Sequence, residues 1–215
     1  MTNNPLSANT RDDFDRAAAA WDESSYRTER AQAIARAIQN AVPLTPNMTA
    51  LEYGCGTGLL SFALQPHLGP ITLADSSPGM LAVLAGKIAA SAVPNMTPLL
   101  LDLLAGPPPA ARAQLIYTLM TLHHIPDTAA ILRAFYHLLE APGWLCVADL
   151  DREDGSFHGP GFDGHNGFDR AALAALAEET GFTNVRFETA YHTPHPANGI
   201  IRHFPVFLMT AEKEG

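Results

Sequence analysis

Residues 50–64 read A-L-E-Y-G-C-G-T-G-L-L-S-F-A-L, and this stretch decides how the rest of the chain folds. A short apolar run meets three alternating glycines, Gly54, Gly56 and Gly58, and a helical apolar pattern then continues to the residue before Pro66. Glycine suits a backbone that must turn sharply and let a ligand approach closely. The stretch predicts a strand over 48–53, a tight turn, and a helix over 58–65 whose N-terminal N–H groups face a ligand.

The residues around this turn indicate what kind of ligand it holds. The spacing is G-x-G-x-G, whereas a dinucleotide fold uses G-x-G-x-x-G. Glu52 precedes the first glycine by two positions, and Asp75 ends the next apolar run, where a ribose-binding carboxylate belongs. No lysine or arginine lies near the turn to pair with a pyrophosphate. These features favour a nucleoside with a ribose over a dinucleotide, and they argue against a dehydrogenase.

The run E-Y-G-C-G-T-G at 52–58 closely resembles motif I of the class I S-adenosylmethionine-dependent methyltransferases of the small-molecule type. Two further stretches carry the resemblance: F-D-x-x-A-x-x-W-D at 14–22 and T-L-H-H-I-P-D at 121–127. The resemblance implies an α/β fold, a doubly wound, Rossmann-like sheet of seven strands with the last one antiparallel and helices on both faces. It also implies S-adenosylmethionine as cofactor, S-adenosylhomocysteine as product, and a small molecule as methyl acceptor.

The resemblance also implies roles for individual residues. Glu52 would contact the methionine ammonium, Asp75 the ribose hydroxyls, and Asp102 the adenine amino group. The full set of implied cofactor residues is Glu52, Gly54, Cys55, Gly56, Gly58, Asp75, Ser76, Met80, Asp102, Leu103 and Thr118.

Two segments outside the motif are candidates for binding the acceptor. Residues 14–42 have a helical pattern that breaks near 22–25, typical either of amphipathic helices packed on the sheet edge or of a lid; the resemblance favours the lid. Residues 151–167 form an acidic, glycine-rich loop after a predicted strand, a natural place for a substrate loop. The candidate substrate residues are Phe14, Trp21, Tyr26, Phe157 and His158.

His123 and His124 follow the strand predicted over 113–120 and are the candidate catalytic residues. A sulfonium-bound methyl group is already activated, so the protein mainly aligns the reactants. A general base is needed only where the acceptor atom carries a proton, and imidazole titrates near neutral pH. We expect His123 to face the cofactor, with structural packing as the alternative for each ring.

No metal site is expected from the sequence. The acidic residues at 149–154 resemble Mg²⁺ ligands in type, but a solvated loop explains them as well. The histidines at 192, 195 and 203 lack cysteine partners and the usual zinc spacing.

Bulk properties narrow the function classes. The 215 residues predict a single domain over 1–215, and the net charge of −9 argues against nucleic acid as the partner. No apolar run approaches the length of a membrane span, no secretory signal is evident, and Cys55 and Cys146 suit a reduced chain, so a cytoplasmic location is expected. Two rivals to methyl transfer stay open: non-methylating chemistry on the same fold, and a non-catalytic regulator that binds S-adenosylmethionine. The sequence does not determine the oligomeric state.

Overall fold

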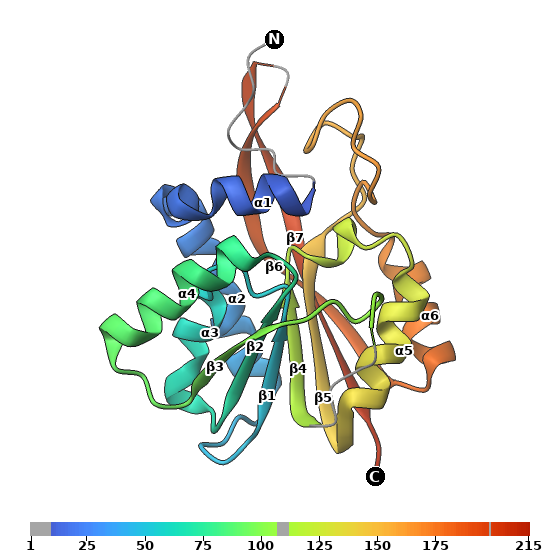
Figure 1. The fold of residues 1–215 in the computed structure, drawn as a ribbon. Helices are drawn as coiled ribbons and strands as arrows, with labels where there is room; N and C mark the ends of the chain where they lie inside the picture. Colours follow the sequence, from blue (N-terminus) through green and yellow to red (C-terminus); the bar gives the residue numbers. More distant parts are fainter. Residues whose placement is uncertain (1–9, 107–111, 198) are drawn as a thin grey trace.

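The computed structural model describes residues 10–106, 112–197 and 199–215, and its centre is one seven-stranded sheet (Figure 1). The strand order is β3-β2-β1-β4-β5-β7-β6. Neighbours from β3 to β5 run parallel, whereas β7 runs antiparallel to both β5 and β6. The predicted doubly wound sheet with an antiparallel last strand is confirmed. The strands are β1 (Ala50–Tyr53), β2 (Ile71–Asp75), β3 (Met96–Leu100), β4 (Ala113–Leu119), β5 (Leu139–Leu150), β6 (Thr183–Ala197) and β7 (Ile200–Lys213).

Helices cover both faces of the sheet, and each face has its own apolar core. Figure 1 shows α2, α3 and α4 on one face and α5 and α6 on the other, and the buried residues divide in the same way. The helices are α1 (Arg11–Ala17), η1 (Ala18–Glu23), α2 (Ser25–Ala41), α3 (Leu59–Leu64), η2 (Gln65–His67), α4 (Pro78–Ser91), η3 (Leu122–His124), α5 (Thr128–Leu138) and α6 (Arg170–Thr180). Among the described helices, none has both the length and the apolar composition to cross a membrane.

Local sequence signals explain where the helices begin. The Ser77 hydroxyl accepts a hydrogen bond from the Met80 N–H, and Pro78 follows as the first residue of α4. Asp127 caps α5 in the same way. The break expected near 22–25 is present as η1, and the N-cap of α2 is Ser24, whose side chain makes no capping bond to a described residue.

The β6–β7 hairpin continues past the end of β5. Pairing between β5 and β7 ends at Leu150 and Val206, so Pro205 lies where β7 has β6 as its remaining ladder neighbour. Proline cannot donate to a ladder, so a position at the edge of the sheet suits it. The extension reaches the N-terminal helices, because Arg30 Nη1 donates to Thr193 Oγ1 over 3.2 Å. The extended part of the hairpin therefore lies beside the carboxyl ends of the parallel strands.

Candidate active site

A cavity of about 330 Å³ lies at the carboxyl ends of β1 to β4, beneath α1 and η1. Figure 1 shows α1 lying across this end of the sheet. In a doubly wound fold the crevice outside the strand carboxyl ends is the usual ligand site. The position of the cavity therefore follows from the topology.

The glycine loop forms the floor of the cavity, and two of its glycines serve different purposes. Gly56 has a φ of +53°, and a Cβ there would meet nothing closer than Trp21 Nε1 at 3.9 Å and Met80 Sδ at 4.0 Å. Gly58 has a φ of +83°, and a Cβ would come within 2.6 Å of Leu84 Cδ1. Gly56 thus leaves room for a ligand, whereas Gly58 allows close packing of α4 on the loop.

Glu52 places a buried carboxyl group against the cavity. Only 2% of the residue is exposed, and its Oε2 accepts a hydrogen bond from the Ser61 hydroxyl, which in turn contacts the Tyr117 hydroxyl at 2.6 Å. Burial raises the pKa of Glu52 to about 8. Among the ion pairs of the described residues, none joins Glu52 to a cation. A cationic ligand group would stabilise its charged form.

Asp75 and Asp102 lie at the ends of β2 and β3 and line the same cavity. Asp75 accepts hydrogen bonds from the N–H groups of Gly56 at 2.7 Å and Ser77 at 2.8 Å, which fix its carboxylate beside the glycine loop. Burial raises the pKa of Asp75. Asp102 is exposed at the cavity mouth, and its Oδ1 accepts from the Leu104 N–H at 2.9 Å.

The N-terminal helices form a roof that is attached to the glycine loop and to α4. Asp15 accepts from the Ser77 hydroxyl and from the Gly79 N–H, the latter at 2.8 Å. Asp22 accepts from the Thr57 hydroxyl and pairs with Lys87 Nζ at 2.6 Å. These contacts place Phe14 and Trp21 over the cavity, as a lid would be placed.

Two arginines of α2 face the same space. The Arg27 guanidinium lies 3.8 Å from the centre of the Trp21 ring, and its Nη1 donates to the Trp21 carbonyl at 2.9 Å. Arg30 is buried, its Nε has no hydrogen-bond partner among the residues that the structure describes, and burial lowers its pKa to about 10. Neither arginine was predicted as a site residue. A signal existed, since Arg27 and Arg30 share the helix face of Ile34, which is otherwise apolar.

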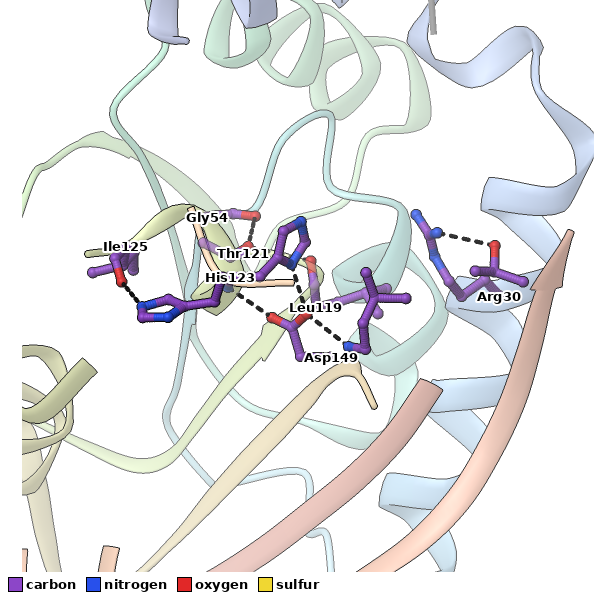
Figure 2. Close-up of polar contacts among 10 residues, drawn as sticks. Arg30, Gly54, Leu119, Thr121, His123, Ile125 and Asp149 are labelled. Atoms are coloured by element: carbon purple, nitrogen blue, oxygen red, sulfur yellow. Dashed lines mark hydrogen bonds and ion pairs between the residues drawn. The ribbon is translucent and has the colours of Figure 1, made fainter. Parts of the chain in front are cut away.

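The histidines after β4 lie differently from the expectation. His124 lines the cavity, with the Phe14 ring edge-on at 5.2 Å. His123 lies behind it, is 1% exposed and is not among the lining residues, so the ring that reaches the cavity is that of His124 and not that of the expected His123. Figure 2 shows the reason: the Asp149 carboxylate contacts His123 Nδ1 at 2.6 Å and accepts from the His123 N–H at 3.2 Å.

His124 is a poor general base in this environment. Burial, reinforced by the neighbouring rings of His123 and His158, lowers its pKa to about 2. Its Nδ1 is buried and has no hydrogen-bond partner in the described part of the chain. The neutral ring therefore offers a lone pair and an apolar face rather than a group that takes up protons at neutral pH.

The loop over 151–167 folds back onto η3. The backbone N–H groups of Arg152 and Glu153 donate to the carbonyls of Phe168 and Asn166, respectively, each at 2.9 Å. The His165 N–H donates to the His123 carbonyl at 2.8 Å. His158 is thereby brought to the histidines, whereas the buried Phe157 ring stacks on His195 with centroids 4.4 Å apart.

The predicted site residues divide into two groups. Those that line the cavity are Phe14, Trp21, Glu52, Gly54, Cys55, Gly56, Asp75, Ser76, Met80, Asp102 and His124. Those that lie outside its lining are Tyr26, Gly58, Leu103, Thr118, His123, Phe157 and His158. Leu103 is in the core and donates its N–H to the Tyr53 hydroxyl at 3.2 Å, and Thr118 is buried within β4.

The turn after β4 supplies lining residues that the sequence did not reveal. Met120 has a φ of +54°, a left-handed conformation that costs about 1–3 kcal/mol for such a side chain. Thr121 Oγ1 follows and lies 3.2 Å from the carbonyls of both Gly54 and Leu119, which ties this turn to the glycine loop (Figure 2). No residue type in the turn after β4 predicts a left-handed conformation.

Comparison with known proteins agrees with this architecture. An O-methyltransferase of ubiquinone biosynthesis from Xylella fastidiosa is 36% identical over 122 residues, covering 56% of this chain and 48% of that protein. The chain spans about half the length of the curated relatives it matches.

Solved structures share the fold at low identity. The N-methyltransferase NodS from Bradyrhizobium japonicum, in complex with S-adenosylhomocysteine, aligns with a TM-score of 0.73 at 17% identity, covering 97% of this chain and 100% of that one. The [4+2]-cyclase SpnF aligns with a TM-score of 0.68 at 14% identity, covering 85% of this chain and 80% of that one.

A family model decides the assignment. The model described as a methyltransferase domain matches residues 26–186, a range that runs from α2 to the start of β6 and includes the glycine loop, Asp75, Asp102 and both histidines of η3. The resemblance seen in the sequence is thereby confirmed: the chain belongs to the methyltransferase domain family of the class I S-adenosylmethionine-dependent enzymes.

Proposed function

We propose that this chain transfers a methyl group from S-adenosylmethionine to a small-molecule acceptor. The observation that carries the proposal is the cavity in which Glu52, the open side of Gly56 and Asp75 converge. A buried carboxyl without a cationic partner suits an ammonium group, and a carboxylate at the end of β2 suits ribose hydroxyls. The residues present therefore fit the cofactor that the family uses.

The cofactor, when bound, supplies a methyl group activated by a neighbouring sulfonium. Glu52, Asp75, Asp102 and the backbone around Gly56 would hold it, and Met80 would pack against it. Arg27 and Arg30 supply positive charge to the cavity and suit a carboxylate, whether of the methionyl group or of an acidic acceptor.

The protein's own contribution is alignment and exclusion of water. Phe14 and Trp21 of the roof and His124 of η3 form an aromatic wall of the cavity, so an acceptor placed against them is shielded from solvent. Because the pKa of His124 is about 2, an acceptor that ionises by itself or carries a free lone pair fits this site better than one that needs a strong base.

The two cysteines support a reducing location. Cys55 and Cys146 are both free and buried, as is usual for a cytoplasmic chain.

Calorimetric titration tests the proposal. Wild type and Asp75→Ala are titrated with S-adenosylmethionine, S-adenosylhomocysteine and NAD, and Glu179→Ala, an exposed change on α6, is the control. We expect wild type and Glu179→Ala to bind both sulfur nucleosides with a Kd of about 1–100 µM, and Asp75→Ala to lose about 100-fold. Binding of NAD alone, or of none of the three, would contradict the proposal.

Product analysis then separates the alternatives. Hydroxylated and amine acceptors are incubated with the cofactor, and S-adenosylhomocysteine is measured. Its stoichiometric formation with a methylated product supports methyl transfer. An altered acceptor without S-adenosylhomocysteine would identify non-methylating chemistry, and binding without turnover of any acceptor would identify a regulator.

A further inference from the structure

Three histidines from two separate segments meet beside the cavity. His123 and His124 belong to η3, and His158 comes from the loop over 151–167. Each offers a ring nitrogen, and these nitrogens all lie within 4.8 Å of one another. The ring centroids are 4.2 Å apart for His123 and His124, 5.0 Å for His123 and His158, and 5.1 Å for His124 and His158.

The first ring is held as a metal ligand is commonly held. Asp149 is fully buried and contacts His123 Nδ1 at 2.6 Å (Figure 2). The Leu150 N–H donates to Asp149 at 2.7 Å and fixes the carboxylate. With the Nδ1 proton directed at Asp149, Nε2 of His123 carries the free lone pair. A carboxylate behind a histidine in this way orients the ring and raises its basicity as a ligand.

The rings of His124 and His158 give the stronger indication of a bound ligand. His124 Nδ1 and His158 Nε2 are both buried and have no hydrogen-bond partner among the described residues. An unpaired buried polar atom costs about 1–3 kcal/mol, so two in contacting rings need a compensating partner. Ring packing alone does not supply one, because it leaves both nitrogens unpaired.

Aromatic side chains pack around the three histidines. The Phe162 ring stacks on His158 with centroids 3.9 Å apart and lies 5.4 Å from His124, and Phe14 covers the other edge of His124 at 5.2 Å. His123 is buried, whereas His124 and His158 are partly exposed, and Phe14 and Phe162 pack against the edges and faces of their rings.

We propose that His123, His124 and His158 form a binding site for Zn²⁺. Three imidazole nitrogens are a ligand set that this cation takes, with the fourth tetrahedral position left for water or another donor. Zn–N bonds of about 2.0–2.1 Å place tetrahedral nitrogens about 3.3 Å apart, so the rings need to approach by about 1.5 Å at most. His158 is on a loop and can supply that movement by side-chain rotation.

The site goes beyond methyl transfer and does not depend on it. The site could not be predicted from the sequence, because 35 positions separate His123 from His158 and no short spacing pattern joins them. Since binding is measured without S-adenosylmethionine, failure of the metal site and failure of the proposed function are distinguishable.

Metal titration tests the proposal directly. Protein freed of any purification tag and of metal is titrated calorimetrically with Zn²⁺, and separately with Co²⁺ while its visible spectrum is recorded. The variants are His158→Ala, which removes one ligand outside the core elements, and His137→Ala, which removes an exposed histidine of α5 as the matched control. Asp149→Asn tests the carboxylate that positions His123.

We expect wild type and His137→Ala to bind about one Zn²⁺ per chain with equal affinity and to give the intense visible bands of four-coordinate Co²⁺. His158→Ala should bind at least about 100-fold more weakly and lose those bands, and Asp149→Asn should lose about 10- to 100-fold. Absence of stoichiometric binding in wild type, or equal affinity in wild type and His158→Ala, would overturn the proposal. Thermal unfolding of each variant without metal checks that the fold is retained.

Discussion

The two ends of the cavity are assembled in opposite ways. At the cofactor end, Glu52, Gly56 and Asp75 come from one strand, its glycine turn and the strand beside it. At the histidine end, η3, the end of β5 and the loop over 151–167 must all be in place before the rings meet. The first end is determined by local backbone geometry, and the second by tertiary packing. Substitutions should therefore affect binding at one end and stability at the other.

The largest effect is expected for Gly56→Val. The new side chain would occupy the open space beneath Trp21 and Met80, so binding of S-adenosylmethionine should weaken by at least about 100-fold, or about 3 kcal/mol. The positive φ adds about 1–2 kcal/mol of strain to the fold. Calorimetry and urea denaturation measure the two quantities separately.

Gly86→Ala is the matched control, because a Cβ on Gly86 meets no atom within 4 Å. It should leave the binding unchanged. Binding by Gly56→Val within about threefold of wild type would show that the glycine loop does not hold the cofactor.

For Asp149→Ala we expect the reverse, a loss of stability with little change in cofactor binding. The change leaves His123 Nδ1 and two backbone N–H groups unpaired in the core, so the free energy of unfolding should fall by about 3 kcal/mol. Binding of S-adenosylmethionine at a temperature where the variant stays folded should change by less than about threefold.

Asp127→Ala gives the scale for this loss. It removes the exposed N-cap of α5 and should cost about 1 kcal/mol. If both variants lost equal stability, the buried Asp149 contacts would be no more important than a surface cap.

A smaller effect concerns pH at the cofactor end. The pKa of Glu52 is raised from 4.5 to about 8 by burial, so between these values the folded chain holds a proton that the unfolded chain has released. Stability from this group is complete below pH 4.5 and is lost as the pH rises through 8, at about 1 kcal/mol per unit between pH 6 and 8. Urea denaturation across this range should show Glu52→Gln gaining stability relative to wild type as the pH rises.

Ligand binding gives a second measurement of the same group. A cationic ammonium favours ionised Glu52, so binding of S-adenosylmethionine at pH 7 should release up to about one proton, detected by calorimetry in buffers of different ionisation enthalpy. Parallel stability curves for wild type and Glu52→Gln, together with no proton release, would refute the assignment.

The smallest effect is expected for Tyr26→Phe. Tyr26 does not line the cavity, and its ring lies 5.7 Å from the Arg27 guanidinium. Cofactor affinity and kcat/KM should stay within about twofold of wild type. Trp21→Ala is the contrasting variant, because the Trp21 ring both lines the cavity and stacks on Arg27; it should raise the acceptor KM by about tenfold. If the two variants had equal effects, lining the cavity would not distinguish Trp21 from Tyr26 in acceptor binding.

The same division explains what the sequence could predict. Glu52, Gly56 and Asp75 were identified because a strand, a glycine turn and a second strand place their ends side by side whatever surrounds them. Gly58 and Leu103 occupy motif positions, yet the first allows α4 to pack and the second lies in the core, and motif position alone does not separate packing from ligand contact.

The histidine end was less accessible to sequence reasoning. Adjacent residues in a short 3₁₀ turn point in different directions, so T-L-H-H could not show that His124 rather than His123 reaches the cavity. The orientation of the His123 ring is determined by its contact with Asp149, which is distant from it in sequence. Arg30 was visible as a charge on an apolar helix face, but its burial depends on the β6–β7 hairpin that packs behind it.

The roof has a consequence for the timing of turnover. Asp15 and Asp22 attach α1 and η1 to Ser77, Gly79, Thr57 and Lys87, all of which lie on the loop and helix that border the cofactor end. We expect a nucleoside held beneath this roof to leave faster when those hydrogen bonds break. We therefore expect the residence time of the spent nucleoside, rather than the transfer step, to limit how often the cavity can be reloaded.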